Sequence, residues 1–194
     1  MKRLLIRTLK VLGWCVAVIV LVPLLCFAYY DLTEFQPRRD DIARLIAPAH
    51  PDERSPPAML RKLLLTDQHG DPSWTVTRIL LSDLEVPRGM RGGLGWHGTG
   101  FLWWQLVRIH LSHEEQLVIL CSRSFLGRRA YGYEAGARAY FGRPLDQLTD
   151  AELATLVVVA RWPSRWNQPE AFNEIAAPRD RLLAHTRSGE PFPY

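Results

Sequence analysis

The sequence contains only three cysteines among its 194 residues. Cys15 and Cys26 lie in an apolar N-terminal run, which leaves Cys121 as the single cysteine of the rest of the chain. Cys121 falls on the apolar side of its expected helix, a position that favours a buried structural thiol over a nucleophile. These positions exclude a disulfide-bonded scaffold, and we expect no cysteine chemistry in the body of the protein.

Beyond residue 10 the sequence also lacks an excess of either charge. The chain holds 24 Lys and Arg against 20 Asp and Glu. Lys2, Arg3, Arg7 and Lys10 account for the difference, which leaves 20 against 20 in the remainder. A body without surplus basic residues lacks the stripe that releases counterions from a nucleic acid. We therefore expect no nucleic-acid partner.

Motifs for nucleotides and metals are missing as well. The glycine-rich segment 89–100, GMRGGLGWHGTG, is expected to be a loop, but it has neither the lysine nor the spacing of a phosphate-binding loop. His110 and His113 share a helix face, yet no third ligand is evident, and HLSHE is not the HExxH of zinc proteases. We expect no cofactor and no metal site.

A long apolar run is the first feature that is present. Residues 11–30, VLGWCVAVIVLVPLLCFAYY, contain no charged side chain. A helix of this length crosses a hydrocarbon core of roughly 30 Å. The cationic residues before the run, with Asp31 and Glu34 after it, favour a cytoplasmic N-terminus. A cleaved signal peptide is the alternative, but its apolar region is usually only about 7–15 residues long and ends at a small-x-small site. We predict a single transmembrane helix.

Composition divides the chain into five parts. Residues 1–10 form a basic flank and 11–30 the transmembrane helix, and the polar segment 31–57, which ends in Ser-Pro-Pro, is expected to be a stalk. Residues 58–169 suffice for one domain. Residues 170–194 form a C-terminal tail with a short helix expected around 178–185.

Capping boxes predict two helix starts within that domain. Ser112 is followed three residues later by Glu115, and Thr149 by Glu152, so that hydroxyl and carboxylate can each accept from a free amide of the first turn. Apolar residues then recur at spacings of three and four. Gly142 is placed to end a third helix between them. These patterns predict an all-α fold.

The segment from Ser112 to Asn167 also resembles a known family. Without a gap it is similar to the C-terminal half of the glycosyltransferase family 51 domain, the peptidoglycan transglycosylase module of penicillin-binding proteins. The matching runs are SHEEQL at 112–117, AYGYEA at 130–135, YFGR at 140–143, LTDAE at 148–152 and PSRWN at 163–167. The resemblance implies a lysozyme-like, transglycosylase-type helical domain, held at the bacterial inner membrane by the N-terminal helix with its body on the periplasmic side.

The N-terminal half of the family pattern is divergent and truncated here. In the family a glutamate takes the proton of the acceptor sugar hydroxyl, while cationic side chains stabilise the diphosphate-lipid leaving group. The segment that ends at His69 resembles the family's first motif. Counting back along the chain from His69 places the family's glutamate at Arg61. The nearest carboxylate, Asp67, is not at the position that the motif requires. Arginine accepts no proton at neutral pH. The second family glutamate falls near Gly100, because the chain before Ser112 is shorter than the family pattern.

Two sets of residues are candidates for a site. Glu114 and Glu115 are weak catalytic candidates, since they are the paired carboxylates nearest the glycine-rich segment, although Glu115 is also explained as a capping partner. The substrate-binding candidates are three arginines and two tryptophans: Arg123, Arg128, Arg129, Trp103 and Trp104. The arginines could hold a diphosphate or carboxylates, or could simply be solvated. The tryptophans could stack on a sugar or pack in the core.

The resemblance implies a membrane-anchored, transglycosylase-like protein associated with cell-wall glycan. Its activity is expected to be weakened or lost, which would make it a pseudoenzyme, because the family's glutamates are not found. The expected partners are the lipid bilayer, lipid-linked disaccharide-peptide or peptidoglycan strands, and cell-wall synthesis proteins. The alternative is a non-catalytic, membrane-tethered adaptor of cell-wall assembly whose cleft has closed.

Overall fold

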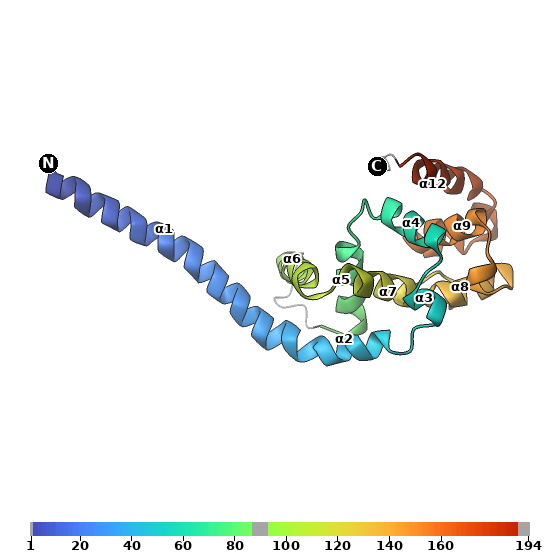
Figure 1. The fold of residues 1–194 in the computed structure, drawn as a ribbon, viewed down its shortest axis with the longest axis horizontal. Helices are drawn as coiled ribbons and strands as arrows, with labels where there is room; N and C mark the ends of the chain where they lie inside the picture. The colour runs from blue at the N-terminus through green and yellow to red at the C-terminus, as the bar shows by residue number, and fades with distance from the viewer. Residues whose placement is uncertain (1, 87–92, 190–194) are drawn as a thin grey trace. The chain divides into compact units, whose positions relative to one another are not determined.

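A computed structural model describes residues 2–86 and 93–189 (Figure 1). Within these ranges the chain is helical with no strand, apart from an isolated bridge between Phe125 and Tyr131. The all-α fold expected from the sequence is confirmed. The chain divides into two compact units, Met1–Asp40 and Asp41–Tyr194. The five-part division drawn from composition stays a prediction.

The first unit is a continuous helical segment. Helix α1 (Lys2–Tyr30) contains Pro23 and runs into a π-helical turn, η1 (Asp31–Phe35), and a 3-10 turn, η2 (Gln36–Arg38). The helical stretch Leu12–Ile46 includes a window with a mean hydropathy of 2.4, none of which is buried inside the protein. By length and composition it is a candidate membrane span.

The second unit consists of short helices. In chain order they are α2 (Arg39–Ile46), α3 (Pro51–Arg54), α4 (Ala58–Asp67), α5 (Ser73–Asp83), α6 (Gly93–His110), α7 (His113–Arg123), α8 (Tyr133–Phe141), the 3-10 turn η3 (Leu145–Gln147), α9 (Asp150–Arg161), α10 (Pro163–Trp166), α11 (Pro169–Phe172) and α12 (Ala176–Ser188). Helix α6 starts at Gly93, so most of the segment expected to be a glycine-rich loop is helical, while residues 89–92 lie outside the described part.

The predicted capping boxes are confirmed. Ser112 Oγ accepts from the amide of Glu115 at 3.2 Å, and Glu115 Oε2 accepts from the amide of Ser112 at 2.7 Å. Thr149 and Glu152 make the same exchange at the start of α9. The helix end predicted at Gly142 is also confirmed, since this residue is the left-handed C-cap of α8 with φ 67°.

Helix α9 lies at the centre of the second unit, because every residue from 153 to 159 is buried. A helix that is buried all round belongs in a core. Helices α4 and α12 pack against α9, and α12 contributes Leu182 and Leu183 from the C-terminal tail (Figure 1). Helix α5 packs against α6 and α7. The ends of α5, α7 and α9 also line a cavity described below.

Part of the segment predicted as a stalk packs within this unit. Glu53 on α3 is buried; its Oε1 accepts from the amide of Glu134 at 3.0 Å and its Oε2 from the amide of His50 at 3.1 Å. Burial raises the pKa of Glu53, and these hydrogen bonds oppose the increase. Gly132, with φ 86°, leaves room for this carboxylate, because a Cβ there would lie 2.4 Å from Glu53 Oε1. Glu53 thus caps the start of α8.

Candidate functional site

A groove of about 500 Å³ lies between α5, the end of α7, the loop 124–132 and the end of α9. We call it the arginine groove, because three of its lining residues are arginines, Arg78, Arg123 and Arg161. Each arginine comes from a different helix, α5, α7 and α9 respectively. The packing of these three helices therefore assembles the cationic lining.

Two of the three arginines are paired with carboxylates. Arg123 Nε lies 2.7 Å from Asp83 Oδ2, and Arg161 Nε lies 2.5 Å from Asp67 Oδ1. Arg78 is exposed, and no carboxylate in the described part of the chain pairs with it. Arg78 is therefore the groove arginine that can offer its full charge to an anionic ligand.

An aromatic pair forms one wall of the groove. The rings of Phe125 and Tyr131 have centroids 4.9 Å apart, and the two side chains are 42% and 61% exposed. The loop that carries them is closed by the bond from the Gly132 amide to the Ser124 carbonyl at 2.9 Å. Exposed rings beside arginines suit a ligand that has both apolar faces and anionic groups, as an acidic sugar has.

The tip of this loop has an uncommon backbone conformation. Gly127, Arg128 and Arg129 have φ values of 75°, 49° and 59°, in a region that residues other than glycine seldom occupy. Tyr140 stabilises the tip, because its hydroxyl donates to the Leu126 carbonyl at 2.7 Å and its ring lies 4.1 Å from the Arg128 guanidinium. Such strain persists only where the surroundings hold it.

A smaller, less open pocket of about 190 Å³ adjoins the groove and shares five of its lining residues. Asp67, at the end of α4, lines this pocket and is 7% exposed. Its Oδ2 accepts from Gln68 Nε2 at 2.6 Å. Burial raises the pKa of Asp67, while Arg161 and Gln68 act in the opposite direction. The pocket thus places a buried carboxylate beside the arginines.

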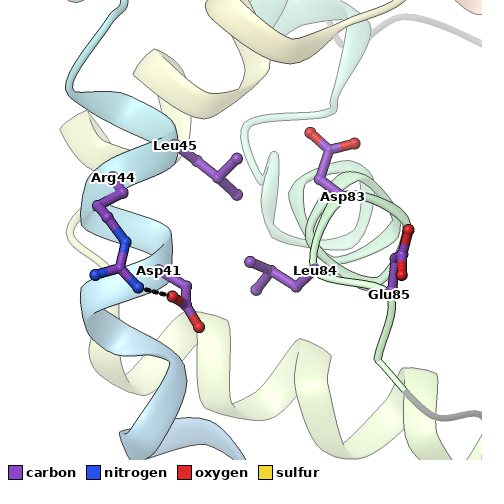
Figure 2. Close-up of a pocket in the computed structure, with 6 residues that line it drawn as sticks. All are labelled: Asp41, Arg44, Leu45, Asp83, Leu84 and Glu85. Atoms are coloured by element: carbon purple, nitrogen blue, oxygen red, sulfur yellow. Dashed lines mark hydrogen bonds and ion pairs between the residues drawn. The ribbon is translucent and has the colours of Figure 1, made fainter.

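A second, shallow pocket of about 400 Å³ lies between α2 and the end of α5 (Figure 2). Leu45 and Leu84 point into the space between the two helices, and Arg44 pairs with Asp41 at its edge (Figure 2). Asp83 lines both this pocket and the arginine groove. The residues that line this pocket do not point to a particular kind of ligand.

Of the arginines predicted to bind substrate, Arg123 alone lines the groove. Arg128 packs over Tyr140 and donates to the Ala139 carbonyl at 3.2 Å, so it stabilises the loop. Arg129 is exposed at the loop tip. Both therefore lie outside the groove lining.

The predicted tryptophans lie elsewhere. Trp103 is fully buried in the core, which is the alternative that the sequence left open. Trp104 is partly buried; its Nε1 donates to Ser73 Oγ at 2.7 Å, and its ring contacts Trp74 and Phe101. Neither tryptophan lines the groove or its adjoining pocket.

The two candidate glutamates also lie outside the groove. Glu115 is the capping partner of Ser112, and Glu114 pairs with Arg61, whose Nη1 donates to Oε2 at 2.8 Å. The hydrogen bond with Arg61 lowers the pKa of Glu114. Arg61, the position counted for the family's glutamate, is therefore occupied in a surface ion pair.

Two features of the site could not be predicted from the sequence. Asp67 and Arg161 are 94 positions apart, and no local pattern predicts that they meet. Arg78 is the single basic residue of α5, and no local pattern predicts that it faces the other arginines. The position of Arg161 at a helix end, directly before Trp162-Pro163, was the signal that marked it as a possible anion ligand.

Among the described residues, His50, Asp52 and Glu134 bring three potential metal ligands within 4.8 Å of one another. The Glu134 oxygens already accept from Arg138 Nε at 2.7 Å and from the Leu145 amide at 2.8 Å. His50 accepts from the Asp52 amide as the cap of α3. These hydrogen bonds explain the cluster as part of the fold.

Comparison with known proteins identifies a relationship over the second half of the chain. Residues 104–187 match the model of a family described as Transglycosylase. This match confirms the resemblance deduced from the sequence. The matched range includes Arg123, the loop 124–132 and Arg161, whereas Asp67 and Arg78 precede it.

Individual relatives show the same limit. Penicillin-binding protein 1A of Pseudomonas aeruginosa is 40% identical over 61 residues, 31% of this chain and 7% of that protein. Penicillin-binding protein 1A of Escherichia coli is 35% identical over 74 residues, 38% of this chain and 9% of that protein. A Cupriavidus necator protein named as a transglycosylase is 42% identical over 69 residues, 36% of this chain and 27% of that protein. The chain thus spans less than a third of the length of each relative.

Proposed function

We propose, on the premise of a transglycosylase-related segment at 104–187, that this protein is a membrane-anchored, transglycosylase-like protein that binds cell-wall glycan in the arginine groove. The carrying observation is that Arg78, without a carboxylate partner in the described chain, lies in one groove with the exposed rings of Phe125 and Tyr131. The ligand class is a peptidoglycan strand or its lipid-linked disaccharide-peptide precursor.

The chemistry of this ligand matches the groove. Peptidoglycan sugars carry carboxylates, and the lipid-linked precursor also carries a diphosphate. A guanidinium binds both kinds of anion through paired N–H donors, and these charge-assisted bonds are stronger than neutral ones. The aromatic wall offers apolar contact to a sugar ring. Arg78 would hold the anion while Tyr131 packs against the sugar.

Weakened catalysis is part of this proposal. Arg61, at the counted position of the family's glutamate, has no proton-accepting form at neutral pH and is held in an ion pair with Glu114 outside the groove. A general base contributes about 10²–10⁴-fold to a rate. Glycosyl transfer without a general base at position 61 is therefore expected to be slow.

Membrane anchoring is the third part. The apolar stretch within Leu12–Ile46 supports one span at the bacterial inner membrane, with the body on the periplasmic side beside lipid-linked precursors and cell-wall synthesis proteins. The alternative adaptor function requires a closed cleft. The open groove of about 500 Å³ counts against that alternative.

Binding of purified, uncrosslinked glycan strands to the full chain in detergent tests the proposal. Saturable binding is expected, and Arg78→Gln should weaken it by about tenfold or more, since a hydrogen bond to a charged group contributes about 1.5–3 kcal/mol. Arg129→Gln is the matched control, because it removes an exposed arginine outside the groove. An adaptor with a closed cleft would show no saturable binding.

A further inference from the structure

Asp67 is a carboxylate whose position in the fold suggests a chemical role. Its side chain is 5% exposed, and it lines the pocket that adjoins the groove, together with Arg78 and Arg161. Among the described residues that line that pocket, no other carries a carboxylate. The pocket therefore places one buried acid at the inner end of the proposed glycan site.

The surroundings of Asp67 adjust its basicity in two directions. Burial disfavours the ionised form and raises the pKa of Asp67, whereas Arg161 from α9 and the neighbouring Gln68 and His69 favour the ionised form. Arg78 from α5 and the Tyr133 hydroxyl from α8 complete the titratable groups of the pocket. Burial raises the pKa of Tyr133 well above its ordinary value, so this phenol stays neutral. A carboxylate with a raised pKa is a better proton acceptor near neutral pH.

The geometry also separates Asp67 from the position that the sequence comparison selected. Arg61 and Asp67 are six residues apart on α4, and a helix turns by about 100° per residue, so the two side chains lie on different faces. Arg61 pairs with Glu114, while Asp67 lines the pocket. The carboxylate that α4 presents to the pocket adjoining the groove is therefore Asp67.

We propose that Asp67 is the proton-accepting residue for the glycosyl transfer that this groove retains, an inference that rests on the function proposed above. In this step the hydroxyl oxygen of the acceptor sugar forms a bond to the anomeric carbon of the donor sugar. The bond from that carbon to the diphosphate oxygen breaks, and the diphosphate leaves with the electron pair. The hydroxyl proton passes to Asp67 and then to solvent. Arg78 stabilises the negative charge of the leaving diphosphate.

The test measures polymer formation from lipid-linked disaccharide-peptide by the full chain in detergent, with glycan-strand binding measured in parallel. Wild type is expected to form polymer slowly. Asp67→Asn should lower the rate by about 10²-fold or more while glycan strands still bind. Asp150→Asn is the matched control, because Asp150 pairs with Arg187 at 3.0 Å and lines neither the groove nor its pocket. This control should keep the wild-type rate.

A pH profile separates a proton acceptor from a merely structural residue. The wild-type rate should rise with pH as Asp67 loses its proton, with a midpoint above the ordinary range of an aspartate. Asp67→Glu keeps a carboxylate and should retain a pH-dependent part of the activity, which keeps the test decisive if Asp67→Asn fails to fold.

The failures of the two proposals are distinguishable. A wild type that binds glycan strands but forms no polymer overturns the role of Asp67 and leaves the binding function intact. A folded Asp67→Asn variant with the wild-type rate, or an Asp67→Glu variant with a flat pH profile, overturns it as well. A wild type that binds no glycan overturns both.

Discussion

Arg61 donates from Nη1 to Glu114 Oε2 at 2.8 Å and so joins α4 to the first turn of α7 on the protein surface. The two residues are 53 positions apart. Sequence comparison alone suggested Arg61 as the place of a lost catalytic glutamate. In the structure this position carries a surface ion pair that links two helices.

This arrangement predicts that Arg61→Glu does not restore activity. The substitution would place two carboxylates together at the surface, because Glu114 would face a second acidic side chain instead of a guanidinium. Polymer formation should stay at or below the wild-type rate, and the unfolding midpoint should fall. Lys62→Glu makes the same charge change at the neighbouring exposed residue and should leave the midpoint closer to wild type. A rate increase in Arg61→Glu would show that the groove is not the site of transfer.

Tyr131 is expected to contribute apolar contact to glycan binding. Tyr131→Ala should weaken the binding of glycan strands by about 2- to 10-fold, since an aromatic contact contributes about 0.5–1.5 kcal/mol beyond the area it buries. Trp74→Ala removes another exposed aromatic residue, one that lies against Trp104 outside the groove. Equal losses for the two variants would argue against the aromatic wall as a binding surface.

Gly132 is predicted to be essential for the stability of the second unit. Gly132→Ala forces a side chain into a left-handed backbone with φ 86° and puts its Cβ 2.4 Å from Glu53 Oε1. The left-handed strain costs on the order of 1–3 kcal/mol, and displacement of the Glu53 cap adds to it. Gly142→Ala is the control, because Gly142 has φ 67° but no neighbouring atom within 4 Å. Denaturant unfolding should show the larger loss for Gly132→Ala.

The cap of α9 is predicted to weaken in acid. The hydrogen bond from the Thr149 amide, the Thr149 hydroxyl and the nearby Arg143 guanidinium lower the pKa of Glu152 in the folded protein. A lowered folded pKa means that Glu152 stabilises the fold above its ordinary pKa and that this contribution is lost as pH falls through the folded pKa. The unfolding free energy of Glu152→Gln should therefore approach that of wild type in acid. A difference that is the same at every pH would contradict this assignment.

The segment that begins at Gly93 is helical, although its composition predicts a loop. Glycine-rich composition predicted a loop, since glycine is unfavourable in a helix interior by about 1 kcal/mol. In the structure the segment continues into the apolar turns of α6, which pack on α5. A Cβ added at Gly100 would make an ordinary van der Waals contact, 3.7 Å from the ring of Trp74, so Gly100 lies on the side of α6 that faces α5. Tertiary packing outweighed the local preference.

The starts of α7 and α9, the end of α8 and the all-α class follow from the sequence by itself, because caps and apolar periodicity depend on residues three or four positions apart. The groove depends on residues far apart in the chain. Asp67 meets Arg161, and Asp83 meets Arg123, only after α4, α5, α7 and α9 have packed. Charged side chains on separate helices carry no local signal of their partners, so only the tertiary structure decided which of the arginines line the site.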